Sequence, residues 1–230
     1  MKRKDYETVV VFDIRNFSAH RYHLGKPENR GGGSLLTQLV TDILNLAVDL
    51  LESKEQAFSS EEEHLLNHTG DGFVLVVRGS RNALIALWWI SKFRDRVSAR
   101  MKRYDSQRRK EFKKVKLDPL NFGIGAHSGI IMPLKFKTFG DRYRDGFLGS
   151  AANIASRVEQ CTKDHSCNVI CTKLLWDRAL KFIKKRHHKD TEVLRQSLGK
   201  HRLRGFPNSY TLYCLEPGFH ERITKSMLER

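Results

Sequence analysis

The chain has 230 residues, a formal net charge of +16 at pH 7, a hydrophobic share of 40% and a charged share of 30%. The length suits one large domain, 1–230, and this composition favours a soluble protein with a buried core. No apolar run suggests a membrane span, and the basic first residues are not followed by the apolar segment of a signal peptide. We therefore expect a cytoplasmic protein without membrane insertion.

The positive charge attracts polyanions in general, and much of it lies in runs. These runs are 94–116, 181–189 and 195–204. A run of like charges is most often a solvated face, and the alternatives are a nucleotide substrate, an acidic partner or, least favoured, a nucleic acid. We therefore expect no nucleic-acid partner.

Four cysteines are present, at spacings that do not match a paired zinc site. In a cytosolic chain such cysteines are most often free thiols. We expect Cys161, Cys167, Cys171 and Cys214 to be free and buried.

The apolar spacing predicts alternating strands and helices. Strands are expected at 7–14, at 121–127 with another nearby, at 168–171 and at 210–215, with a hairpin at 65–77. Helices are expected at 35–51, about 80–101, 150–161 and about 172–181. A flexible loop at 25–34, a polar link at 52–63, a possible basic helical extension at 102–118 and a tail or short helix at 217–230 complete the chain. This order fits an α+β fold with a ferredoxin-like βαββαβ core and a C-terminal elaboration.

Two carboxylates lie at the ends of apolar runs. Asp13 follows the run from Val9 to Phe12, and Asp71 lies in a Gly-Asp-Gly turn between two apolar runs. Taken singly, Asp13 reads as a capping residue and Asp71 as a turn residue. Brought together by a sheet, they would form a hard oxygen site for a divalent metal, which beside a basic surface favours chemistry on phosphates.

A later segment, 147–159, adds polar groups on a predicted helix. Asn153 and Arg157 are four residues apart and so project from one face, while small residues on the other faces permit close packing. An amide and a guanidinium can orient a ribose and neutralise a phosphate, although a plain solvated stripe has the same pattern. The glycine-rich segment 122–129 predicts close backbone approaches, and its His127 favours a structural role.

These segments, in this order, resemble the catalytic domain of class III nucleotidyl cyclases over about 7–215. The matching motifs are 12–18, 70–73, 123–129 and 149–159. The resemblance implies that the 3′-hydroxyl of a nucleoside triphosphate is joined to its own α-phosphate with release of pyrophosphate. It also implies a head-to-tail homodimer in which each site takes residues from both subunits.

By this resemblance, Asp13 and Asp71, with the Ile14 carbonyl, would hold two Mg²⁺ or Mn²⁺ ions. The backbone of Arg15, Asn16, Phe17 and Ser18 would receive phosphate oxygens at a helix start. Asn153 would orient the ribose, and Arg157 would stabilise charge on the α-phosphate. Arg204 is similar to the late basic residue of the family that contacts the terminal phosphates.

The two positions that read the base depart from the family. Asn67 stands where a lysine or glutamate is usual, and Gly146 stands where the family has an acidic, hydroxyl or thiol side chain. An amide can pair with the edge of uracil or of cytosine, so a pyrimidine substrate is a chemically sensible reading. The combination resembles the stand-alone pyrimidine cyclases of Pycsar anti-phage systems, whose cyclic UMP or cyclic CMP would activate a separate effector.

Other readings stay open. A conventional adenylate cyclase with a remodelled base pocket, or a promiscuous or degenerate cyclase, carries the same motifs. A basic RNA-binding module would suit the charge but lacks the interleaved aromatic signature. A relative of diguanylate cyclases or polymerase palms would leave the Asn153 and Arg157 segment unexplained, and a pseudoenzyme would keep all these residues.

Overall fold

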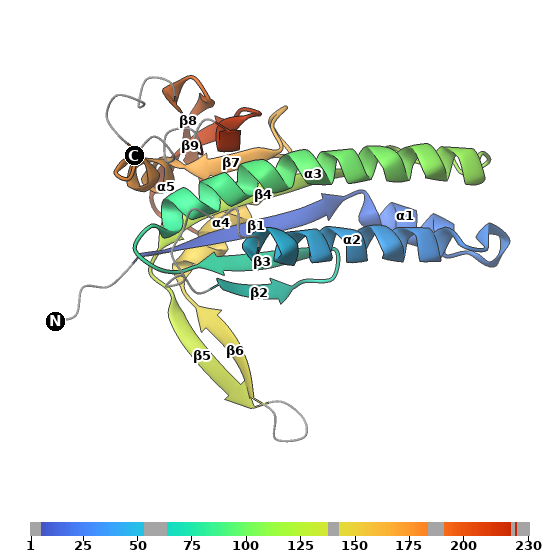
Figure 1. Cartoon of the computed structure of the whole chain (residues 1–230), viewed down its shortest axis with the longest axis horizontal. Helices are drawn as coiled ribbons and strands as arrows, with labels where there is room; N and C mark the ends of the chain where they lie inside the picture. The colour runs from blue at the N-terminus through green and yellow to red at the C-terminus, as the bar shows by residue number, and fades with distance from the viewer. Residues whose placement is uncertain (1–5, 53–63, 138–142, 184–190, 222–223, 225–230) are drawn as a thin grey trace.

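The computed structural model describes residues 6–52, 64–137, 143–183, 191–221 and 224, and its centre is a mixed seven-stranded sheet (Figure 1). The strand order is β2-β3-β1-β4-β7-β9-β8. These strands are β1 Glu7–Arg15, β2 His64–His68, β3 Gly72–Val77, β4 Asn121–Gly129, β7 Val169–Thr172, β8 Arg195–Arg202 and β9 Ser209–Leu215. The helices are α1 Phe17–Leu24, η1 Pro27–Asn29, α2 Gly32–Glu52, α3 Asn82–Glu111, α4 Ser150–Cys161 and α5 Lys173–Leu180.

One face of the sheet is covered by α2, α3 and α5, which together bury the main core (Figure 1). Alternate residues of β1, namely Val10, Phe12 and Ile14, point into this core. The Phe12 ring packs against Phe73 and Phe93, with ring centroids 5.0 and 5.2 Å apart. Because strand side chains alternate between faces, the register that buries these residues turns Val9, Val11 and Asp13 to the opposite face.

That opposite face carries α4, which lies directly on β4. A Cβ atom added at Gly125 would lie 2.1 Å from the backbone nitrogen of Glu159 and 2.3 Å from the carbonyl oxygen of Ala155. At Gly123 it would lie 2.2 Å from Oε1 of Glu159. The expected close approach at the glycine-rich strand is therefore the contact between the backbones of β4 and α4.

The strands β5 Met132–Lys137 and β6 Tyr143–Leu148 form a separate two-stranded hairpin. This hairpin, called the arm below, projects away from the seven-stranded sheet (Figure 1). Its exposed side chains include Met132 at 58% and Leu148 at 55% exposure. Exposed apolar groups of this size on a projecting hairpin are typical of a contact surface.

The expected α+β fold is confirmed, and most predicted elements are found within a few residues of their expected bounds. Helix α1 and strand β8 were not predicted, and where one further strand was expected after 121–127 the structure has two, β5 and β6. The loop expected at 25–34 contains η1 and the start of α2, and the basic extension continues α3 to Glu111 (Figure 1). The link 53–63 and most of the tail beyond 221 lie outside the described residues.

The prediction of four free cysteines was wrong for two of them. Cys167 and Cys214 form a disulfide across 47 residues, with their Cα atoms 6.1 Å apart. They lie in a small hydrophobic cluster between α4, β7 and the β8–β9 hairpin, while Cys161 and Cys171 are free. The bond thus joins the segment after α4 to β9.

The prediction that no segment is apolar enough to span a membrane needs one correction. By length and composition, α2 is apolar enough to cross a membrane, the one such helix among the residues described. In the structure its apolar side chains, including Leu36, Leu39, Ile43, Leu46 and Leu50, are buried in the core. A helix that is buried in the core of a protein can be as long and as apolar as a membrane-spanning helix.

His127 is a buried histidine whose pKa differs between the folded and the unfolded chain. It is 4% exposed and its Nδ1 lies 2.9 Å from Oγ1 of Thr172. Burial lowers its pKa from 6.5 to about 4, so between these pH values the unfolded chain binds a proton that the folded chain does not. Stability is therefore expected to fall as pH falls through this window.

The parent protein is expected to lose unfolding free energy when the pH falls from 7 to 5. We expect this loss to be smaller by roughly 2 kcal/mol in His127→Gln, which has no imidazole to protonate. Urea denaturation at both pH values measures this difference, and comparing differences cancels the direct effect of the substitution. His68→Gln, at an exposed histidine, is the matched control. An unchanged pH difference in the His127 variant would contradict the assignment.

Candidate active site

Asp13 lies near the end of β1, half-buried, on the face of the sheet that carries α4. The strand register sets it opposite Gly72 of β3 and Gly123 of β4. Neither neighbour has a side chain, and the space over Gly123 is occupied by the side chains of Glu159, Thr162 and Arg15. The alternation of β1 thus presents one charged group at the end of an otherwise apolar strand face.

Asp71 reaches the same place from the turn between β2 and β3. The backbone N–H of Thr69 donates to the Gly72 carbonyl at 3.0 Å, and the N–H of Ile14 donates to the Asp71 carbonyl at 3.3 Å. A Cβ atom at Gly72 would lie 2.1 Å from the Phe12 carbonyl oxygen, so only glycine permits this approach. The turn is therefore attached to the end of β1, as the sequence predicted.

The two carboxylates repel each other. Burial raises the pKa of Asp13, and the negative charge of Asp71 raises it further, whereas Lys163 and Arg15 act in the opposite direction. A divalent cation would relieve this repulsion, and carboxylate oxygens suit Mg²⁺ or Mn²⁺. Within the described residues no cluster of three or more acidic, histidine or cysteine side chains could hold a metal. The donor set therefore fits a metal that takes its other ligands from backbone carbonyls, such as that of Ile14, from water and from substrate phosphates.

A sharp turn follows β1 and begins α1. Asn16 adopts a left-handed conformation with φ 63°, and its Nδ2 donates to the Pro119 carbonyl at 3.1 Å. The helix begins at Phe17, so the first backbone N–H groups of α1 have no partner within the helix. Arg15, Asn16, Phe17 and Ser18 thus lie at a helix start, the setting in which backbone groups bind anions.

A cavity of about 980 Å³ lies between this helix start, α2 and the Asp71 turn. Its lining includes Phe17, Ser18, Leu36, Thr69 and Asp71. The volume is at the upper end of the range for ligand clefts, about 300–1,000 Å³. The structure therefore brings Asp71 and the expected phosphate turn to the edge of one cavity.

Two side chains near Asp13, those of Glu159 and Arg15, were given no role from the sequence, which assigned only the backbone of Arg15 to phosphate binding. Glu159 of α4 is buried, and burial together with the charge of Asp13 raises its pKa. The Arg15 guanidinium lies 3.7 Å from Oε1 of Glu159 and donates to the Thr162 carbonyl at 3.2 Å. The only signal in the sequence was the position of Glu159 one turn beyond Ala155 on the packed face of the helix.

Asn153 and Arg157 project from the other side of α4. Asn153 is exposed, and Arg157 donates a hydrogen bond to Gln160 at 2.8 Å on the same exposed face. Ala155 and Glu159, each two residues further on, face the sheet, because two helical residues turn the chain by about 200°. Within one chain, Asn153 and Arg157 therefore point away from the layer that holds Asp13.

Arg204 is exposed in the turn between β8 and β9. Its neighbours Leu203 and Phe206 pack with Ile154 and Val158 of α4. The candidate residues thus form two groups in one chain. The first contains Asp13, Asp71 and the turn at 15–18, and the second lies on and beside α4.

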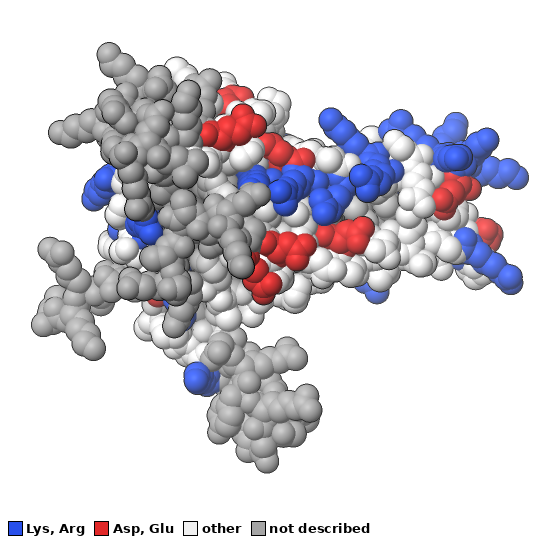
Figure 2. All heavy atoms as spheres, in the orientation of Figure 1, with Lys and Arg blue, Asp and Glu red and all other residues white. Residues whose placement is uncertain are grey.

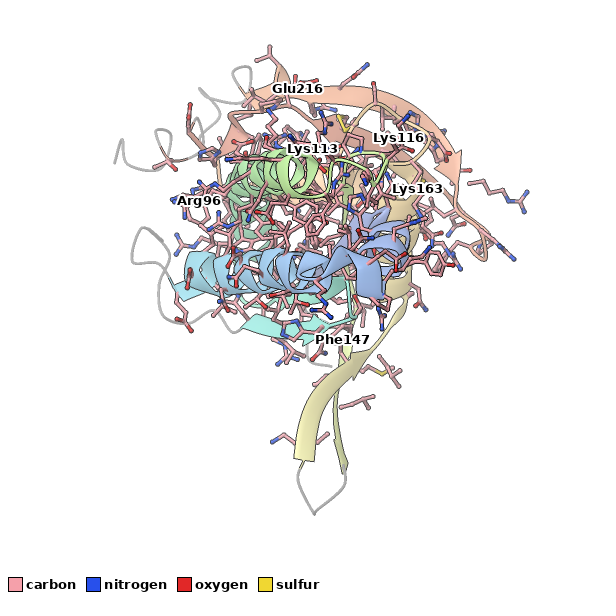
Figure 3. The ribbon with its side chains drawn as sticks, turned by 90° about the vertical axis from the view of Figure 1, so that its right-hand side faces the viewer. Arg96, Lys113, Lys116, Phe147, Lys163 and Glu216 are labelled. Atoms are coloured by element: carbon pink, nitrogen blue, oxygen red, sulfur yellow. A yellow bond between two sulfur atoms is a disulfide. The ribbon has the colours of Figure 1, made fainter. Side chains whose placement is uncertain are left out.

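The two expected base-reading positions lie in different sheets. Asn67 is half-buried in β2 of the main sheet, opposite Val74, and Gly146 is buried in β6 of the arm, opposite Leu134. Phe147 lies where the arm leaves the body (Figure 3) and packs in one cluster with Val74, the residue opposite Asn67. The contact between Phe147 and this cluster links the root of the arm to the strand pair that carries Asn67.

Solved structures of cyclase catalytic domains have the same fold. The adenylyl cyclase CyaB from P. aeruginosa aligns with a TM-score of 0.61 and 16% identity, over 91% of this chain and 93% of that one. The guanylyl cyclase Cya2 aligns with a TM-score of 0.62 and 14% identity, over 93% and 92%. The guanylate cyclase domain of RhGC from Catenaria anguillulae, solved with GTP, aligns with a TM-score of 0.58 and 15% identity, over 94% and 99%.

Similarity in sequence is narrower. An adenylate cyclase from Anabaena cylindrica is 31% identical over 71 residues, which are 31% of this chain and only 14% of that protein. No protein-family model matches the chain. At these identities the agreement concerns the arrangement of helices and strands, and on that ground the chain has the α+β fold of class III adenylyl and guanylyl cyclase domains.

Proposed function

We propose that the chain is a nucleotidyl cyclase that converts a pyrimidine nucleoside triphosphate, UTP or CTP, to its 3′,5′-cyclic monophosphate. The observation that carries this proposal is the meeting of Asp13 and Asp71 beside a helix start, within a cyclase fold. In the reaction, the 3′-oxygen bonds to the α-phosphorus, the bond from that phosphorus to the bridging oxygen breaks, and pyrophosphate leaves as the hydroxyl proton is released.

Asp13 and Asp71, with the Ile14 carbonyl, would hold two divalent ions, Mg²⁺ or Mn²⁺. When bound, these ions lower the pKa of the 3′-hydroxyl and neutralise the triphosphate. The backbone N–H groups of Phe17 and Ser18 would donate to phosphate oxygens at the start of α1. The cavity beside Asp71 supplies room for the nucleotide.

Asn153 would orient the ribose, Arg157 would stabilise negative charge developing on the α-phosphate, and Arg204 would contact the terminal phosphates. In one chain these groups face away from Asp13, whereas a second copy would bring its own set over the first copy's carboxylates. We therefore propose a head-to-tail homodimer with composite sites. The exposed apolar side chains of the arm support such a contact.

For the base, we propose that Asn67 pairs its side-chain amide with the edge of a pyrimidine. Gly146 adds only backbone and space, so the usual purine contacts are missing at both positions. We place UTP slightly ahead of CTP. By the resemblance to Pycsar cyclases, the product would be a second messenger in anti-phage defence and would activate a separate effector.

A second candidate is a conventional adenylate cyclase with an altered base pocket. The short match to the Anabaena cylindrica adenylate cyclase favours it. Both candidates require the same carboxylates, so only the identity of the base distinguishes them.

Separate incubations of the purified protein with ATP, GTP, CTP and UTP in Mn²⁺ distinguish the candidates. We expect a cyclic pyrimidine monophosphate as the main product, identified by chromatography and mass, and none from Asp71→Ala. A main product of cyclic AMP would retain cyclisation and overturn the reading of Asn67 and Gly146. No cyclic product from any nucleotide would overturn the proposed activity.

A further inference from the structure

The C-terminal half of α3 and the turn that follows it carry a dense positive charge. Residues 96–116 contain ten lysines and arginines but only two acidic residues. Figure 2 shows these side chains along the exposed side of α3 and gathered at its end. We call the exposed and half-exposed cations of this stretch the basic ridge.

Within the part of the chain that the structure describes, little of this charge is neutralised by ion pairs. Of the two acidic residues, Asp105 is buried against Arg108, and the exposed Glu111 accepts a hydrogen bond from Gln107. Among the residues that the structure describes, no cation of the basic ridge forms an ion pair. Beside the middle of the ridge, Asp42 and Asp49 of α2 line a hollow together with Arg100 and Arg103, so both signs of charge are mixed there (Figure 2). The positive charge is less balanced at the end of α3 and in the turn that follows, and this end of the ridge favours an anionic partner.

The end of the ridge is held in a fixed shape by buried polar contacts. Arg108, 1% exposed, donates to the carbonyls of Val115 at 3.3 Å and Leu117 at 3.2 Å. These bonds fold the turn at 112–117 back over the end of α3. Nε2 of His20 in α1 donates a further hydrogen bond at 2.8 Å to the Asp118 carbonyl, which fixes the turn to α1.

This arrangement creates a concave basic surface. A cavity of about 490 Å³ lies between α1 and the turn, and Arg109, Lys113 and Lys116 line it. A second hollow of about 640 Å³ on the other side of the turn is lined by Arg30, Lys110 and Lys114, among others. Figure 3 shows Lys113 and Lys116 around the near end of α3. The cations therefore surround the turn instead of forming one flat row.

The extent of the ridge indicates a ligand with many phosphates. Residues 96–111 span about 24 Å of helix, and the turn continues the positive surface beyond them. A mononucleotide is much shorter, whereas duplex nucleic acid presents one charge per about 1.7 Å of its axis. None of the strongly exposed large apolar side chains in the described residues lies within 96–118. The ridge thus lacks the stacking groups that single strands use and the apolar groups that insert into membranes.

We propose that the basic ridge binds double-stranded nucleic acid through its phosphate backbone, without reading the base sequence. This departs from the expectation that the chain has no nucleic-acid partner. The sequence showed only a run of charge, whereas the structure adds that these cations form no ion pair with the residues described and that those around the turn line concave surfaces. DNA and RNA duplexes share the required chemistry and are separate arms of the test.

The test is equilibrium binding, by fluorescence anisotropy, of labelled duplexes of about 20 base pairs to the full chain over a series of salt concentrations. The ridge variant replaces four exposed cations by glutamine: Arg109, Lys113, Lys114 and Lys116. The control variant removes the same charge elsewhere by glutamine at four other exposed cations: Lys173, Lys181, Lys200 and Arg202. Circular dichroism checks that both variants are folded.

We expect the ridge variant to bind duplex at least tenfold more weakly, with a salt slope of log affinity reduced by about 3, while the control stays within about twofold of the parent. An equal loss in both variants would overturn the proposal, since net charge alone would then explain binding. Tighter binding of a single strand or of phosphatidylserine vesicles than of either duplex would also overturn it, as would the absence of duplex binding. Because cyclisation is not measured, failure here is distinct from failure of the proposed activity.

Discussion

Replacing Asp71 by asparagine is expected to lower the rate of cyclisation by at least about 10³-fold while the protein stays folded. The substitution removes one of two charged ligands for the proposed ions, and a loss of about 4 kcal/mol of transition-state stabilisation corresponds to this factor. Folding should be preserved because the backbone bond from Ile14 to the Asp71 carbonyl is unchanged, and the repulsion that raises the pKa of Asp13 is removed.

Initial rates with the preferred nucleotide in Mn²⁺, together with the thermal midpoint of unfolding, measure both parts of this prediction. Asp49→Asn, at an exposed carboxylate on α2, is the matched control and should retain the parent rate. A rate within tenfold of the parent for Asp71→Asn would show that this carboxylate is not a ligand essential to the reaction.

Mixing two inactive variants is expected to restore activity if the sites are composite. Asp71→Asn damages the carboxylate group of residues, and Arg157→Ala damages the α4 group, which faces away from Asp13 in one chain. In an equal mixture, half of the dimers are hybrids and each hybrid has one intact site, so about one quarter of the parent activity should return.

The control mixture combines Asp71→Asn with Asp13→Asn, which damage the same half of the site. No hybrid of these two variants contains an intact site, so no activity should return. Recovery in neither mixture, with exchange of subunits verified by differently tagged chains, would contradict the composite arrangement. Equal recovery in both would point to contaminating parent protein.

The meeting of Asp13 and Asp71 was predictable because each follows from a local pattern. Strand alternation fixes the face on which Asp13 lies, and the glycines around Asp71 permit the tight turn that approaches β1. The split of α4 into a packed face and a polar face followed from helical spacing in the same way.

The elements missed from the sequence lack such patterns. Helix α1 buries only His20 and Leu24, so its sequence shows little apolar periodicity. Strand β8 is an edge strand with mostly polar side chains, and its only hydrogen-bonded neighbour in the sheet is β9. In both cases tertiary contacts and backbone pairing, not side-chain alternation, stabilise the element.

Contacts between residues far apart in the sequence could not be predicted from local patterns either. Cys167 and Cys214 are adjacent because β7 and β9 pair in the sheet, which spacing along the chain does not reveal. Likewise, Glu159 comes to lie near Asp13 because α4 sits on β4, and only the fold places Arg15 between them.

The bare backbone of β4 restricts how this protein can diverge. At Gly125 an added Cβ atom would meet backbone atoms of Glu159 and Ala155, so no side-chain rotation can make room for a larger residue. At Gly123 the nearest atoms belong to the side chains of Glu159, Thr162 and Arg15, which can move. A larger residue at Gly125 would therefore lift α4 and with it Asn153 and Arg157, whose position relative to a partner is thereby tied to a single glycine.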